Sequence, residues 1–79
     1  MFRIMTLNEF VKAFVAELEE TPEEMITPAT EYKTLDEWGS LCALSIIAMV
    51  DENFDKSITG ADLRSVNTVE ELYNLVLAK

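Results

Sequence analysis

Residues 35–54, LDEWGSLCALSIIAMVDENF, decide the fold of this chain. From Ser40 to Phe54 the stretch contains neither proline nor glycine, and its apolar residues recur at helical spacing, which predicts a helix of about fifteen residues. One side of this helix carries Leu41, Leu44, Ile47, Ala48 and Phe54. The other side is also apolar, with Cys42, Ile46, Met49 and Val50. So small a protein cannot bury both sides, so one of them is predicted to meet a partner.

Capping boxes indicate where two further helices begin. In Thr6-Leu7-Asn8-Glu9 the threonine hydroxyl can accept the amide of residue 9, while the Glu9 carboxylate can accept the amide of residue 6. We expect that helix to end near residue 20, before Thr21-Pro22. Thr68 to Glu71 repeats the box and opens a last helix, and Thr59 with Asp62 predicts a short one over residues 59–65.

Residues 21–39 show no sustained period and contain two Thr-Pro steps, which predicts a long loop. Such a loop is uncommon in a compact domain unless it is functional or folded back on its own side chains. We therefore expect an ordered loop, with apolar anchors in Met25, Ile26, Tyr32, Leu35 and Trp38. The predicted architecture is a single all-α domain over residues 1–79, a bundle of three main helices and one short helix with a long first loop.

The charge of the chain is strongly negative. Fifteen Asp and Glu face six Lys and Arg, for a net charge of −9 at pH 7. Such a surface repels nucleic acid and anionic membranes and attracts a protein with a basic patch, although solubility alone would explain it equally well. We expect a soluble monomer that binds neither nucleic acid nor membranes.

The residue types that the chain lacks argue against catalysis. It has no histidine, the commonest general base, so we expect neither an enzyme nor catalytic residues. The single cysteine, Cys42, excludes an internal disulfide and favours a reducing compartment, which predicts a cytoplasmic location. No stretch has the length of a membrane span or the pattern of a signal peptide.

Residues 51–62, DENFDKSITGAD, resemble an EF-hand calcium loop, with oxygen-bearing side chains at positions 1, 3, 5, 7, 9 and 12. Two departures weigh against calcium binding. Lys56 stands where the sharp turn needs glycine, and Asp62 stands where the loop needs the longer glutamate. Without a second such loop, calcium binding is kept only as an alternative, and no metal site is predicted.

The chain as a whole resembles the acyl carrier protein family. The resemblance lies in an acidic loop, the approach Leu35-x-x-Trp38-x-Ser40-Leu41, a helix ending Asp51-Glu52-Asn53-Phe54, a short third helix and Thr68-Val69 at the last one. Ser40-Leu41 matches the Ser-Leu of the family's Asp-Ser-Leu signature, whereas Gly39 replaces its aspartate. This replacement predicts slower modification or a dedicated transferase.

The resemblance implies that a separate transferase attaches 4′-phosphopantetheine to Ser40. The thiol of that arm would carry acyl groups as thioesters to enzymes of fatty acid, polyketide or related biosynthesis. The residues themselves favour this position, because the N-terminus of a helix offers free amides and partial positive charge to a phosphate. Two alternatives stay open: Ser40 caps the helix, or the chain is an unmodified helical binding module.

The resemblance also implies a docking surface for the phosphopantetheinyl transferase and for acyl-processing enzymes with basic patches. Apolar contacts are expected from Leu41, Ile46 and Met49. The charges expected around them are Asp36, Glu37, Asp51 and Glu52. Single surface charges contribute little, but a ring of them would set the orientation and rate of association.

Overall fold

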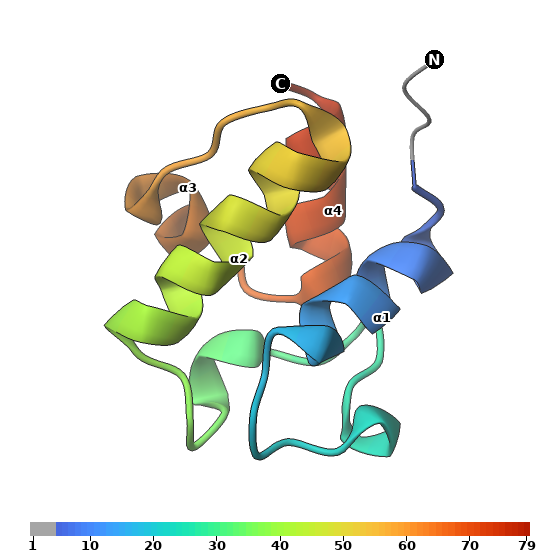
Figure 1. Ribbon diagram of the computed structural model, residues 1–79, viewed down its shortest axis with the longest axis vertical. Helices are drawn as coiled ribbons and strands as arrows, with labels where there is room; N and C mark the ends of the chain where they lie inside the picture. Colours follow the sequence, from blue (N-terminus) through green and yellow to red (C-terminus); the bar gives the residue numbers. More distant parts are fainter. Residues whose placement is uncertain (1–4) are drawn as a thin grey trace.

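The computed structural model describes residues 5–79, which form a compact all-α domain, as predicted. Its helices are α1 (Leu7–Ala16), α2 (Ser40–Phe54), α3 (Gly60–Ser65) and α4 (Val69–Leu77). Helix α1 packs against α2 and α4, and α2 packs against α3 (Figure 1). Residues 5–79 form no strand, only an isolated bridge between Glu31 and Thr68. They also include no helix long and apolar enough to cross a membrane.

Three of the four helices begin at complete capping boxes. Thr6 with Glu9, Thr59 with Asp62, and Thr68 with Glu71 each exchange two hydrogen bonds between side chain and backbone. The bonds span only three residues, and each satisfies donors that a helix start leaves unpaired. The predicted starts of α1, α3 and α4 are therefore confirmed, as is the whole extent of α2.

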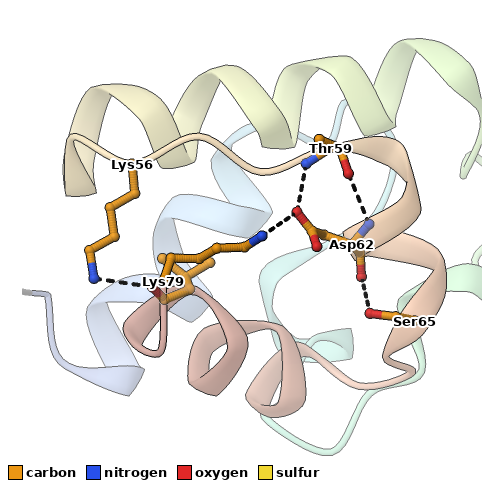
Figure 2. Close-up of polar contacts among 6 residues, drawn as sticks. Lys56, Thr59, Asp62, Ser65 and Lys79 are labelled. Carbon is orange, nitrogen blue, oxygen red and sulfur yellow. Dashed lines mark hydrogen bonds and ion pairs between the residues drawn. The ribbon is translucent and has the colours of Figure 1, made fainter.

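Polar contacts join α3 to the end of α4. Figure 2 shows the Asp62 carboxylate accepting the Thr59 amide at 2.9 Å and pairing with the Lys79 ammonium at 2.9 Å. The Lys56 ammonium donates to the carbonyls of Val76 and Leu77, the last residues of α4. Both lysines therefore place positive charge close to that end of α4, which carries a partial negative charge.

Helix α1 ends at Ala16, so the predicted end near residue 20 is wrong. The amides of Glu17 and Leu18 turn back to the carbonyls of Phe14 and Val15, which tightens the chain. This turn brings the Leu18 side chain into the core. Beyond it, the amides of Glu19, Glu20 and Thr21 bond to the Glu37 carboxylate instead of to helix carbonyls.

The long loop is ordered and contains two short 3-10 turns, η1 (Glu23–Met25) and η2 (Tyr32–Thr34). Ile26 and Tyr32 are buried, while Leu35 and Trp38 are half-buried against the core, so these anchors are confirmed. Met25 is 60% exposed, and its prediction as an anchor is wrong. The loop also caps α4, because the carbonyls of Pro28 and Thr30 accept the amides of Glu70 and Val69.

The structure shows which side of α2 faces the core, a choice that the sequence pattern left open. Ile46 and Met49 are 0% and 4% exposed, and they lie in the core with Val50 and Phe54. Leu41 and Leu44 are 81% and 60% exposed. The helix is apolar nearly all round, so its period could not select a face. Packing against α1 and α3 selects it.

Candidate functional site

Ser40 is the first residue of α2, and its side chain is exposed. Gly39 occupies the N-cap position with no side-chain cap, so the alternative that Ser40 caps the helix is wrong. The Ser40 hydroxyl forms no hydrogen bond within the described part of the chain, and neither do the amides of Ser40, Leu41 and Cys42. The start of α2 therefore presents a hydroxyl and free N–H donors, unlike the capped starts of the other helices.

A hollow of about 430 Å³ opens on one side of Ser40. Its lining includes Ser40, Leu41, Cys42 and Ser45 of α2, together with Glu17, Glu19, Glu20 and Glu37. Of these glutamates only Glu37 was predicted at the site, because the other three lie some twenty residues before Ser40 in the chain. The only sequence signal was the concentration of acidic residues between Glu17 and Glu37. We call this hollow the acidic hollow.

Glu37 holds one wall of the acidic hollow in place. Its carboxylate accepts the amides of Glu19, Glu20 and Thr21 at 2.8–3.1 Å, and the Thr21 hydroxyl at 2.6 Å. The Thr21 hydroxyl bond, helped by the backbone amides and opposed by partial desolvation, lowers the pKa of this carboxyl. Glu37 is therefore not the free docking charge that we predicted, because its carboxylate is used within the fold.

Cys42 lies next to this wall and donates its thiol to the Glu37 carbonyl at 3.1 Å. Burial, and then the negative charge of Glu37, raise the pKa of the thiol above its ordinary value. A raised pKa leaves little thiolate at neutral pH, so Cys42 is a poor nucleophile. Its half-buried position fits packing against the core.

A second hollow, of about 210 Å³, opens on the other side of Ser40, between α2, η2 and α3. Its lining consists of Lys33, Trp38, Gly39, Ser40, Ala43, Gly60, Leu63 and Arg64. The Lys33 ammonium donates to the Arg64 carbonyl at 3.1 Å, and the Arg64 guanidinium lies over Gly60. We call it the basic hollow, and sequence reasoning had assigned neither cation to the site.

Trp38 connects the site to the core. Its ring stacks on Phe14 with a centroid distance of 6.3 Å and meets Tyr32 edge to face at 4.9 Å. Tyr32 is buried and donates its hydroxyl to the Leu63 carbonyl, and burial raises the pKa of Tyr32 to about 12. These contacts fix the end of the loop, so Ser40 is presented from a packed base.

The predicted docking residues do not form one surface. Leu41 is exposed beside Ser40, but the prediction that Ile46 and Met49 contact partners is wrong, because both side chains are buried. Asp36 is exposed in the loop before α2. Asp51 and Glu52 are exposed at the far end of α2, roughly 17–18 Å along the helix axis from Ser40 at 1.5 Å per residue. The exposed apolar neighbour that we missed is Leu44.

Residues 51–62 do not form a calcium loop. Asp51 and Asn53 lie within α2, and the Asn53 amide donates to the Met49 carbonyl at 2.9 Å. Asp62 is engaged in the capping box of α3 and in the pair with Lys79. Nowhere in residues 5–79 do three or more Asp, Glu, Cys or His side chains gather in a group that could hold a metal ion.

No base within residues 5–79 contacts the Ser40 hydroxyl, and the Glu37 carboxylate is occupied by backbone amides. Comparisons with protein-family models, curated proteins and solved structures found no match for this chain. The functional assignment therefore rests on the residues and on the geometry around Ser40.

Proposed function

We propose that this chain is an acyl carrier protein that bears 4′-phosphopantetheine on Ser40. The observation that carries the proposal is an exposed hydroxyl at the first residue of α2 that, like three backbone amides in the same turn, has no hydrogen-bond partner within residues 5–79. A phosphodiester on this oxygen would place negative charge where the helix offers donors and partial positive charge.

The attachment step needs a second protein. The Ser40 oxygen attacks the phosphorus atom of coenzyme A that bears the pantetheine arm, and the bond to the nucleotide phosphate breaks. The adenosine bisphosphate leaves with that bond's electron pair, and the hydroxyl proton passes to a base of the transferase. This chain supplies the acceptor oxygen and the surface that the transferase binds.

The carrier itself catalyses no reaction in this proposal. The thiol of the arm holds an acyl group as a thioester, and tethering raises the concentration of that group at the active site of a bound enzyme. A reducing cytoplasm, the compartment proposed for this chain, would keep that thiol free for acylation.

The proposed partners are the phosphopantetheinyl transferase and acyl-processing enzymes with basic patches. Beside Ser40 they would meet the exposed side chains of Leu41 and Leu44, together with Glu17, Glu19 and Glu20 of the acidic hollow. Apolar contact would supply affinity, while the charges would steer the approach and fix the orientation.

Intact-mass measurement tests the proposal. The purified chain is incubated with coenzyme A and a broad-specificity phosphopantetheinyl transferase, and we expect one addition of the mass of the arm. Ser40→Ala should abolish the addition. Ser45→Ala is the matched control, because it removes a hydroxyl of α2 that lines the same hollow and should leave the addition intact. An unmodified wild type, or loading that survives in Ser40→Ala, would refute the carrier function.

A further inference from the structure

Ser40 lies between two hollows of opposite charge. Four glutamates, Glu17, Glu19, Glu20 and Glu37, line the acidic hollow, whereas the basic hollow contains Lys33 and Arg64 and no acid. Both hollows include Gly39 and Ser40 in their linings. An anion on the Ser40 oxygen therefore meets repulsion on one side and attraction on the other.

The two cations of the basic hollow stand out in a chain of net charge −9. Of the other lysines in the described residues, Lys79 pairs with Asp62, Lys56 donates to carbonyls at the end of α4, and Lys12 is exposed on α1 and lines neither hollow. Lys33 and Arg64 form no salt bridge within residues 5–79, although Lys33 lies near enough to Glu71 to interact with its charge. Lys33 gives one hydrogen bond to a carbonyl and keeps two of its three donors.

We propose that Lys33 and Arg64 hold the phosphate ester carried by Ser40, so that the arm leaves the molecule on the α3 side. This rests on the proposed function for the identity of the arm, but the chemistry recognised is that of any phosphate ester on Ser40. Arginine and lysine are the usual phosphate ligands, through charge-assisted hydrogen bonds. Lys33 comes from η2 and Arg64 from α3, and both line the basic hollow, whose lining contains no glutamate.

The size and floor of the basic hollow suit a small anion with a chain attached. Its volume of about 210 Å³ is below the range of about 300–1,000 Å³ typical of pockets for drug-sized ligands. Trp38, Ala43 and Leu63 line it with apolar surface, against which the first carbons of the arm can lie. Trp38 is the only tryptophan of the chain, so its fluorescence reports on an occupant.

Phosphate binding by the basic hollow is tested without any transferase, on protein into which phosphoserine is incorporated at position 40 by genetic code expansion. The second pKa of phosphoserine is ordinarily about 6, and nearby cations lower it by favouring the dianion. We expect a phosphorus NMR titration to show that Lys33→Gln and Arg64→Gln each raise this pKa by about 0.5–1 unit. Lys12→Gln, which removes an exposed cation of α1, should leave it unchanged. Equal values in all four proteins would overturn the proposal.

The same substitutions, now in protein with ordinary serine at position 40, are then loaded from coenzyme A by a transferase and compared by Trp38 fluorescence. We expect loading to change the emission of the wild type and of Lys12→Gln, and to change that of Arg64→Gln less. A phosphoserine pKa that responds to Lys33 and Arg64, in a chain that never gains the mass of the arm, would support the pocket for a simple phosphate and refute the carrier function. If the mass shows that the arm is loaded, but neither Lys33→Gln nor Arg64→Gln changes the pKa of the phosphoserine, only the role of the basic hollow is refuted.

Discussion

Gly39 is the residue at which the chain departs from the signature of the family that it resembles. Its backbone is extended, with φ −170° and ψ −169°, a conformation open to any residue. A Cβ added there would meet no atom within 4 Å. The structure therefore does not require glycine at the N-cap of α2, and an aspartate would fit without strain.

Gly39→Asp should stabilise the protein, because its carboxylate can accept an amide of the first turn of α2 and favours the helix dipole. Gly39→Ala is the matched control, since it restricts the unfolded backbone similarly but offers no acceptor. We expect the aspartate variant to be more stable than the alanine variant by about 1 kcal/mol in chemical unfolding. Equal stabilities would show that the amides of α2 are not available to an acceptor.

Glu37 is the residue whose structural role was least visible in the sequence. Its lowered pKa means that the folded state favours the ionised carboxylate. The resulting stability is fully present above the ordinary pKa of 4.5, and it is lost as the pH falls through the lowered value in the folded protein.

Glu37→Gln should therefore be less stable than the wild type at pH 7, and the difference in melting temperature should shrink below pH 4.5. Protonation of the other carboxylates at low pH relieves charge repulsion in both proteins, so this effect cancels in the difference between their melting temperatures. Asp36→Asn removes an exposed neighbouring carboxylate and should change stability little at either pH. A difference that stays constant from pH 7 to pH 3 would show that the turn over residues 19–21 does not need the charge.

At the scale of the element, α2 gains its stability from one side and leaves the other free. Ile46→Ala should cost about 2–5 kcal/mol of unfolding free energy, because it opens a cavity in the core. Leu44→Ala, a similar truncation two residues away at an exposed position, should cost less than about 0.5 kcal/mol. Equal costs in urea unfolding would contradict the orientation of α2.

The starts of the helices were predictable because their determinants are local. A capping box joins residues three apart, so Thr6, Thr59 and Thr68 with their acidic partners identify α1, α3 and α4 from the letters alone. The face of α2 was not predictable, because Leu44 and Ile46 are equally apolar and only packing distinguishes them. The position of Ser40 followed from the local pattern, since the helix begins there.

The surroundings of Ser40 depend on contacts between distant residues, so the sequence could not reveal them. Glu37 reaches residues 19–21, and Lys33 meets Arg64 thirty-one positions away. The acidic composition predicted a negatively charged surface. It did not predict that acidic and basic side chains would line separate hollows beside Ser40. Single charges become a site only when the loop folds against α2 and α3.

At the scale of the whole molecule, Ser40 is the first residue of α2. That end of the helix lies away from both ends of the described chain (Figure 1). The aromatic contacts of Trp38 hold the loop before it, and the capping contacts of α3 hold the other wall of the basic hollow. We therefore expect the bundle to form a rigid base with one covalent attachment point. Loading with the arm should change the NMR signals of residues around Ser40 and leave the signals of core residues unchanged.

Peptide fragmentation of the loaded protein tests the central claim most directly. After incubation with coenzyme A and a transferase, mass spectrometry of the fragments locates the added arm on a single residue. We predict that every fragment containing Ser40 carries the added mass, and that fragments with only Ser45, Ser57 or Ser65 do not. Mass on another residue, or no added mass with a transferase that loads a control carrier, would contradict the account.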